Sequence, residues 1–270
     1  MASVVIVGID GLGGTYMDNP NFPSVMPNYH RLTISPHCLL HTLHATTVFP
    51  PVSAPAWGSV LTGMTVEQHG IVTNEWPLDR GMDPCEQRGG VPWNIVNEVA
   101  EKCGAAILAL AWPWPRNLLV ADDRIVVTVG SDEEVTSCVQ RCGKLPPLTF
   151  LHLDDVDHAG HDAGWGSNEY YAACSAVDLK LARVLETVAV QEIPTFVIVC
   201  SDHGGSGTDH GEMLACHMRV PLLFASFHCD GKKIVARKNP SYSVLDIAPT
   251  DLKLLDINQP HWMRGVPVTC

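Results

Sequence analysis

The chain has 270 residues, with 17 lysines and arginines against 29 aspartates and glutamates, so its formal net charge at pH 7 is −12. This acidic balance argues against nucleic acid as the main partner, because a protein that binds the phosphate backbone needs a basic surface. The length suffices for one α/β domain over residues 1–270, and no apolar run reaches the roughly 18 residues of a membrane span.

The ten cysteines are scattered, with no CxxC pair and no framework typical of a small disulfide-rich domain. Most of them fall in apolar segments, which favours reduced thiols in the core and a reducing compartment. The chain enters its first predicted strand without a basic segment followed by a cleavable apolar one. We therefore expect a cytoplasmic protein that is not bound to a membrane, and the sequence leaves its oligomeric state open.

The first predicted strand covers residues 3–10 and ends in Asp10, which is followed by glycine. Several glycines around this strand superficially resemble a dinucleotide fingerprint, but their spacing is not GxGxxG and no clear helix follows. We do not expect them to bind a nucleotide cofactor. The next elements are a short helix at 26–35 and a strand at 40–48.

The segment after this strand contains a candidate nucleophile. Two prolines end the strand, and a helix is predicted from Ser53 to Gly63. Ser53 followed by Pro55 is typical of a helix start, with serine as the N-cap. Alternatively, the Ser53 hydroxyl lies at a positive helix terminus that attracts an anion, where a metal ion that lowers its pKa makes it a nucleophile. The local sequence leaves both interpretations open.

Other polar and aromatic residues have two interpretations each. His69 is followed by a loop that carries Asn74, and a lone histidine is more often packed and hydrogen-bonded than a ligand. Trp112 and Trp114 follow a predicted strand. They either anchor the core or form an aromatic face beside the leaving group of a substrate.

The rest of the chain alternates between predicted strands and helices. Strands are expected at 105–111, 124–129, 148–153, 195–200 and 220–225; helices at 91–103, 132–142, 168–188 and 243–256; a loop at 75–90 and a tail at 257–270. The apolar strand at 195–200, bounded by a glycine-rich turn, predicts a fully buried strand. This order predicts an α/β fold.

Three of the predicted strands are followed by side chains that bind metals. With the glycine-rich loop after residue 203, they supply six candidate ligands: Asp10, Asp157, His161, Asp202, His203 and His210. The carboxyl ends of the strands in an open α/β sheet form the edge where ligands bind. The sequence therefore predicts a metal site at this edge.

A mixture of carboxylates and imidazoles suits Zn²⁺ or another first-row divalent ion, with Mn²⁺ as the alternative. Six ligands exceed the needs of one tetrahedral ion and fit two ions about 3.5–4 Å apart that share a substrate oxygen. Buried Asp–His pairs without a metal are the alternative. They are less favourable, because three carboxylates that converge without a lysine or arginine in these segments repel one another.

Taken together, the motifs resemble the alkaline phosphatase superfamily and, within it, the type I phosphodiesterase/nucleotide pyrophosphatase family. The resemblance covers nearly the whole chain, and the ordered set of motifs is more specific than any one of them. The motifs are Asp10-Gly, Pro50-Pro-Val-Ser-Ala-Pro-Ala-Trp57, Glu67-Gln-His-Gly-Ile-Val-Thr-Asn74, Asp157-x-x-x-His161, Ser201-Asp-His-Gly204 and Asp209-His-Gly211. The resemblance implies a three-layer α/β/α fold with a central, mostly parallel sheet and a minimal cap.

The resemblance also implies a role for each candidate. One ion would be bound by Asp10, Ser53, Asp202 and His203, with Ser53 as the nucleophile. The second ion would be bound by Asp157, His161 and His210. Asn74 would hydrogen-bond a non-bridging phosphate oxygen. The implied activity is hydrolysis of a small phosphorylated substrate, such as a nucleotide, through a phosphoseryl intermediate.

The chain departs from this family pattern in three ways. The nucleophile of the pyrophosphatases is usually threonine, and Ser53 keeps the hydroxyl. Sulfatases of the superfamily have an arginine where this chain has Trp57, so a sulfatase is not expected. Only six residues separate His203 from His210, where the pyrophosphatases insert a long segment, so we expect little to cover the substrate.

Two other functions stay open. A phosphomonoesterase or phosphonate hydrolase on the same metals would use an arginine, and Arg80, Arg88 or Arg116 could reach the site from loops. A non-catalytic, metal-binding member that acts through interaction is the remaining alternative. It is disfavoured, because all six ligands and the hydroxyl are present.

Overall fold

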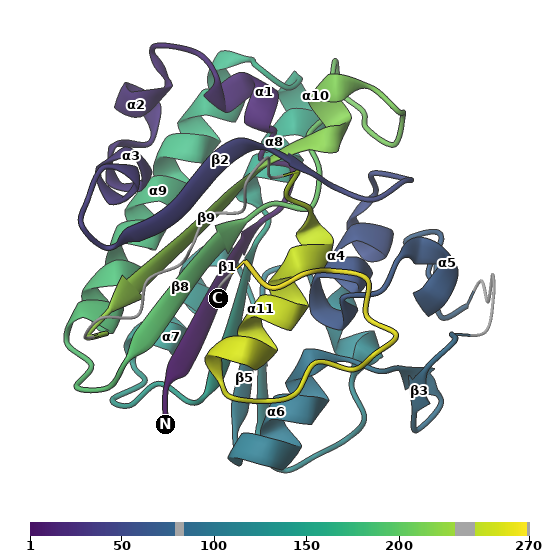
Figure 1. Ribbon diagram of the computed structural model, residues 1–270. Coiled ribbons are helices and arrows are strands. Elements are labelled where there is room, and N and C mark those ends of the chain that lie inside the picture. Colours follow the sequence, from purple (N-terminus) through teal and green to yellow (C-terminus); the bar gives the residue numbers. More distant parts are fainter. Residues whose placement is uncertain (79–83, 230–240, 269–270) are drawn as a thin grey trace.

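The computed structural model describes residues 1–78, 84–229 and 241–268. Its centre is a seven-stranded sheet in the order β2-β9-β8-β1-β7-β5-β6 (Figure 1). The strands are β1 (Ser3–Ile9), β2 (Cys38–Thr46), β5 (Ala106–Leu110), β6 (Ile125–Val129), β7 (Leu148–Leu153), β8 (Thr195–Cys200) and β9 (Arg219–Phe227). Neighbouring strands from β8 to β6 are parallel, whereas β9 is antiparallel to both β8 and β2. The predicted mostly parallel sheet is confirmed.

Helices cover both faces of this sheet (Figure 1). One face packs against α4 (Ser53–Thr62), α6 (Ile95–Cys103) and α11 (Ile247–Leu254). The other face packs against α3 (Pro27–Thr33), α7 (Asp132–Gln140), α8 (Asp155–Ala163) and α9 (Asn168–Ala189). Strand β1 serves both cores, because Val4 and Ile6 lie in one and Val5 and Val7 in the other. The three-layer α/β/α architecture is therefore confirmed.

Shorter elements connect these layers. They are α1 (Gly14–Met17), α2 (Phe22–Val25), α5 (Val66–His69), α10 (Ala215–Met218), the 3₁₀ helices η1 (Trp114–Leu118) and η2 (Val244–Asp246), and a ribbon of β3 (Gln87–Arg88) with β4 (Val91–Pro92). The predicted loop at 75–90 contains β3, and its residues 79–83 lie outside the described part. Among the described residues, no helix has the length and apolar character needed to cross a bilayer.

The predicted first residues of two helices were wrong. The helix expected at 91–103 begins at Ile95, because the Asn94 side chain accepts a hydrogen bond from Asn97 N at 2.9 Å and caps the helix there. The helix expected at 243–256 is instead the 3₁₀ turn η2 followed by α11, with Ser243 capping the turn. Helix α8 had not been predicted as a helix.

The central strands determine where the functional residues lie. In the register of the sheet, Gly8 of β1 is paired with Cys200 of β8 on one side and with His152 of β7 on the other. Every residue of these three strands is buried, which explains their apolar sequences. The segments that follow them therefore emerge side by side at one edge of the sheet.

Candidate metal centre

The first group of candidate ligands lies at the ends of β1 and β8. One ligand atom from each of Asp10, Asp202 and His203 lies within 4.8 Å of the other two. His203 Nε2 is 3.4 Å from Asp10 Oδ1 and 3.3 Å from Asp202 Oδ2. All three side chains are buried. These three residues, which we call the buried half, form a compact set of oxygen and nitrogen ligands.

In each carboxylate of the buried half, the protein binds one oxygen only. Asp10 Oδ2 accepts a hydrogen bond from Trp57 Nε1 at 2.9 Å and lies 3.0 Å from His152 Nε2. Asp202 Oδ1 accepts one from the backbone N–H of Gly11 at 3.2 Å. Among the described residues, the other oxygens, Asp10 Oδ1 and Asp202 Oδ2, have no hydrogen-bond partner. Both of these oxygens face His203.

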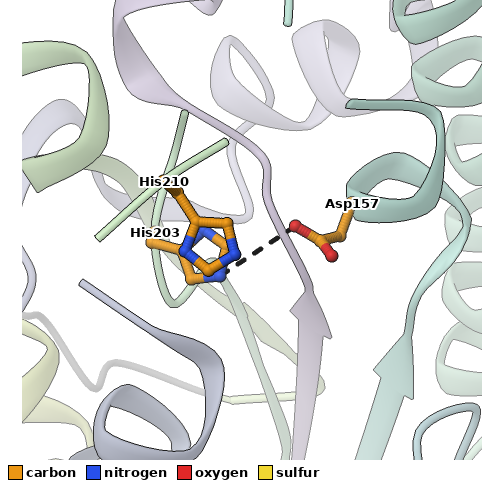
Figure 2. Close-up of side chains that lie close together, drawn as sticks. All are labelled: Asp157, His203 and His210. Carbon is orange, nitrogen blue, oxygen red and sulfur yellow. Dashed lines mark ion pairs between the residues drawn. The ribbon is translucent and has the colours of Figure 1, made fainter. Parts of the chain in front are cut away.

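The second group comes from α8 and from the loop after β8. Figure 2 shows Asp157 of α8 directed towards the stacked rings of His203 and His210. Asp157 Oδ1 is 4.0 Å from His203 Nε2 and, within the described part of the chain, has no hydrogen-bond partner. The two histidine rings are stacked, with centroids 3.8 Å apart. His203 therefore contacts both groups of ligands.

His161 completes this second group. It lies one turn after Asp157 on α8, with Nε2 3.3 Å from Asp157 Oδ2, and its ring centroid is 5.0 Å from that of His210. Its side chain is 39% exposed. Ligand atoms of Asp157, His203 and His210 lie within 4.8 Å of one another. His161 does not belong to this cluster of three. We call Asp157, His161 and His210 the accessible half.

All three histidines present the same nitrogen to the centre. In each ring Nδ1 lies within hydrogen-bonding distance of a backbone carbonyl, which fixes the proton on Nδ1. The distances are 3.0 Å from His203 to Gly204 O, 3.0 Å from His161 to Thr208 O and 2.9 Å from His210 to Pro51 O. In the neutral ring, each Nε2 is then left with its lone pair, which is the form of imidazole that binds a metal ion.

The carboxylates cannot all ionise without a counter-charge. Burial and the charges of Asp10 and Asp157 raise the pKa of Asp202 well above its usual range. Burial also raises the pKa of Asp157. Burial alone would raise the pKa of Asp10, but the hydrogen bond from His152 and the charge of His203 bring it below its usual range. A divalent cation would remove this conflict, because it favours the ionised form of every carboxylate around it.

The imidazoles of the accessible half differ in their protonation. The hydrogen bond to Asp157 raises the pKa of His161 to about 9. Burial, together with the neighbouring His203, lowers the pKa of His210 to about 4. At neutral pH the histidine on the helix is therefore charged while it pairs with Asp157, and the histidine on the loop is neutral and ready to act as a ligand.

Ser53 lies beside the buried half, but it does not cap its helix. The N-cap of α4 is Val52, and Ser53 is the first helical residue, so the predicted N-cap role is wrong. The Ser53 hydroxyl is instead 3.2 Å from His203 Nε2. Asn74 Oδ1 accepts a hydrogen bond from the backbone N–H of Ala54 at 2.8 Å, which brings the Asn74 amide beside Ser53.

The remaining candidates are explained by packing. His69 is buried, 2.9 Å from Ser59 Oγ, and it accepts a hydrogen bond from the N–H of Ile71, as expected for a packed histidine. Trp114 is buried and donates a hydrogen bond to the carbonyl of Trp76. It therefore anchors the core, which is one of the two interpretations of the tryptophans.

Trp112 and the arginines contact other parts of the structure. Trp112 is half-buried, and its ring is stacked on that of Trp114. Arg88 forms ion pairs with two glutamates of α6, Glu98 and Glu101. Arg116 lies in η1 and borders a groove beside β6. Arg80 lies outside the described residues. Arg88 is thus engaged with α6 in this structure.

His152 was not predicted as part of the site. It lies on β7, its side chain is fully buried, and its Nε2 is 3.0 Å from Asp10 Oδ2. A histidine inside a strand that is otherwise almost entirely apolar is the one sequence signal that pointed to it. The indole of Trp57, the second donor to Asp10, could not have been identified from the local sequence, because that hydrogen bond depends on how α4 packs on the sheet.

A comparison with known families identifies the family of this chain. The statistical model of the type I phosphodiesterase/nucleotide pyrophosphatase family matches residues 4–249. The chain belongs to this family. The match includes all six candidate ligands, Ser53 and Asn74, so the predicted resemblance is confirmed.

Two individual relatives share only 20–29% identity with parts of this chain. Ectonucleotide pyrophosphatase/phosphodiesterase family member 3 of Mus musculus is 20% identical over 219 residues, which are 74% of this chain and 24% of that protein. A 2,3-bisphosphoglycerate-independent phosphoglycerate mutase of Haloarcula marismortui is 29% identical over 126 residues, 46% of this chain and 23% of that protein. The chain thus spans about a quarter of the length of these relatives.

Solved structures show the same fold. Murine ectonucleotide pyrophosphatase/phosphodiesterase 5 superposes with a TM-score of 0.72 at 18% identity, covering 98% of this chain and 97% of that one. A 2-O GAG sulfatase superposes with a TM-score of 0.73 at 14% identity, covering 98% of this chain and 73% of that one. The fold is therefore the alkaline phosphatase-like fold that the sequence predicts.

Proposed function

We propose that this protein is a metal-dependent phosphodiesterase or nucleotide pyrophosphatase that uses Ser53 as its nucleophile. The observation that carries the proposal is the convergence on His203 Nε2 of three buried carboxylate oxygens that have no hydrogen-bond partner among the described residues, directly beside the Ser53 hydroxyl. Membership of the family supports the reaction class.

Two divalent ions fit this donor set, with Zn²⁺ as the first choice and Mn²⁺ as the alternative. Asp10, Asp202, His203 and Ser53 would hold one ion, and the accessible half would hold the other. Bound there, the ions would supply Lewis-acid stabilisation of negative charge on oxygen. The position of His203, which contacts ligands of both groups, supports two closely spaced ions.

The residues around Ser53 suit an in-line displacement at phosphorus. The Ser53 hydroxyl lies at the first turn of α4, where the positive end of the helix dipole favours an anionic phosphate. Asn74, anchored through Oδ1, has its Nδ2 group left to donate to a non-bridging oxygen. Ser53 Oγ would form a bond to phosphorus as the bond to the leaving oxygen breaks, and the hydroxyl proton of Ser53 would pass through solvent to that leaving oxygen. Water would then attack the phosphoserine, its oxygen would stay on phosphorus, and Ser53 would leave with a proton from that water.

The substrate proposed is a small phosphorylated molecule such as a nucleotide. The structure of an inactive threonine-to-alanine variant of murine ectonucleotide pyrophosphatase/phosphodiesterase 5 in complex with AMP supports this class. The loop from His203 to His210 is short and is closed by a bridge between Ser206 and Asp209, in keeping with a minimal cap. The compartment proposed is the cytoplasm.

The test is to replace Ser53 with alanine in protein loaded with zinc. With bis-nitrophenyl phosphate as substrate, Ser53→Ala should lower turnover by at least about 10³-fold, because no other group replaces the nucleophile. Bound zinc should stay near two ions per chain. Ser59→Ala is the matched control, since Ser59 lies on the same helix but contacts His69. Turnover close to wild type in the Ser53 variant would rule Ser53 out as the nucleophile.

The same assay separates the other candidate functions. Faster hydrolysis of nitrophenyl phosphate than of the diester would favour the phosphomonoesterase alternative, and a phosphonate ester extends the comparison to a phosphonate hydrolase. Zinc bound without hydrolysis of any phosphoester in a broad panel would favour a non-catalytic, metal-binding role. We expect the diester to be the better substrate.

A further inference from the structure

The carboxylate of Asp10 is held by two donors on the same oxygen. Trp57, on α4, donates a hydrogen bond from Nε1 to Asp10 Oδ2 at 2.9 Å. His152, on β7, places its Nε2 3.0 Å from the same oxygen. All three residues are at most 1% exposed. The other oxygen, Oδ1, is 3.4 Å from His203 Nε2. The two donors therefore fix which Asp10 oxygen faces the metal centre.

The fold builds this contact from three separate elements. His152 of β7 is paired with Gly8 of β1, and Gly8 lies two residues before Asp10. The Trp57 ring packs on β1 at Gly8, where a Cβ atom would lie only 2.5 Å from the ring. The rings of Trp57 and His152 meet edge to face, with centroids 5.1 Å apart. Gly8 thus makes the space that allows the indole to reach Asp10.

This contact also connects Asp10 to the nucleophile. Trp57 lies four residues after Ser53, so the two side chains project from the same side of α4, one turn apart. A hydrogen bond from Trp57 to Asp10 therefore fixes the distance between the first turn of α4 and the end of β1. Ser53 and the Oδ1 atom of Asp10 are held in one rigid unit.

Both donors suit an ionised carboxylate. The indole N–H of tryptophan only donates. The backbone N–H of Trp112 points at His152 Nδ1, 3.4 Å away, which assigns the remaining ring proton to Nε2 and directs it at Asp10. Because the indole is a neutral donor, it leaves the full negative charge of Asp10 to attract the metal ion.

We propose that His152 and Trp57 are positioning residues that orient Asp10 for metal binding and hold the Ser53 helix in register with it. Neither residue contacts the substrate in this account. The proposal rests on the proposed function, because it takes Asp10 as a metal ligand. Outer hydrogen bonds of this kind typically change metal affinity by about 10–100-fold.

The test measures zinc affinity by competition with a chromogenic chelator in four proteins: wild type, His152→Leu, His152→Gln and Trp57→Phe. His152→Leu and Trp57→Phe should each weaken the tighter zinc site by about 10-fold or more. His152→Gln keeps an N–H donor at a similar reach, so its affinity should stay within about 3-fold of wild type. With zinc saturating, kcat of the diesterase reaction should fall in His152→Leu and Trp57→Phe while KM changes little.

The control is His69→Leu, which removes another buried histidine that is bonded to Ser59 and not to a candidate ligand. It should lower the melting temperature of the metal-free protein without changing zinc affinity. Wild-type zinc affinity in both His152→Leu and Trp57→Phe would overturn the proposal, and so would a failure of His152→Gln to restore affinity. If His152→Leu does not fold, Trp57→Phe and His152→Gln decide. A wild-type protein that binds no zinc contradicts the proposed metal centre itself, a result distinct from these.

Discussion

The two halves of the candidate metal centre are built in different ways. In the buried half, Asp10, Asp202 and His203 follow two central parallel strands, and each is at most 1% exposed. In the accessible half, Asp157 and His161 come from α8 and His210 from a loop, and the His161 side chain is 39% exposed. One half is fixed by the sheet, and the other is fixed by a helix and a short loop.

This difference indicates a division of work. The buried half contacts Ser53, so it orients the nucleophile and has little freedom to move. In the accessible half His161 is exposed to solvent, and we expect substrate and product to exchange on this side. We therefore expect changes in the buried half to be severe and independent of zinc concentration, and changes in the accessible half to be milder and compensated by added zinc.

The largest expected effect is that of Asp202→Asn in the buried half. Removing one carboxylate should lower diesterase turnover by at least about 10³-fold, because the ion beside Ser53 loses a charged ligand. The same change should stabilise the metal-free protein on the order of 1 kcal/mol, since it removes the repulsion among Asp202, Asp10 and Asp157. Turnover and urea unfolding without metal measure the two effects.

The control for this stabilisation is Asp178→Asn. Asp178 is also buried, but its two oxygens accept hydrogen bonds from Asn28 N and Tyr29 N at the start of α3. The neutral side chain should bind these donors less well and destabilise the metal-free protein. If Asp202→Asn destabilised it equally, the idea of mutual repulsion in the buried half would be wrong.

A smaller effect is expected for His161→Gln in the accessible half. Turnover at low zinc should fall about 10–100-fold, because the second ion loses one ligand. Added zinc should restore much of the turnover, which it should not do for Asp202→Asn. The measurement is turnover as a function of free zinc for both variants. Equal losses that respond equally to zinc would remove the distinction between the halves.

The smallest effect on activity is expected at Asp251, which is buried on α11 outside both halves. Neither of its oxygens has a hydrogen-bond partner among the described residues, and burial raises its pKa to about 8. The unfolded chain releases this proton above pH 4, so the stability contributed by protonated Asp251 is complete at low pH and is lost as pH rises towards 8.

Asp251→Asn should therefore leave stability nearly unchanged at pH 4 and raise it by a few kcal/mol, on the order of 2, at pH 8. Diesterase turnover should be unchanged. Urea unfolding of both proteins between pH 4 and pH 8 measures this. A stability difference that does not depend on pH would contradict the account of Asp251 as a buried, unpaired carboxylic acid and of its contrast with the metal centre.

The sequence predicted the candidate ligands because their signals are local. Asp10 and Asp202 lie within two residues of the ends of apolar strands and precede glycine or histidine, and the strands are neighbours in the sheet. The hydrogen bonds of His152 and Trp57 to Asp10 were not predicted, because they depend on the register of β1 with β7 and on the packing of α4. Helix α8 was not predicted either, since its sequence is mostly polar or small and Val156 is its only large apolar residue.

The start of α4 shows a further limit of local sequence. Serine before a proline indicates an N-cap, yet the helix begins at Ser53 itself and the hydroxyl turns towards His203. Serine does lie at the start of the helix, as its propensity indicates. The tertiary contact determined that its hydroxyl contacts His203 and does not cap the helix. Such side-chain choices depend on neighbours that are distant in the sequence.

The most direct test of the account is a crystal structure of the protein grown with zinc, with anomalous data collected at the zinc absorption edge. We expect two anomalous peaks about 3.5–4 Å apart. One should be bound by Asp10 Oδ1, Asp202 Oδ2 and His203 Nε2, and the other by Asp157, His161 and His210. A single peak, or peaks that leave the free oxygens of Asp10 and Asp202 without a ligand, would contradict the two-ion centre.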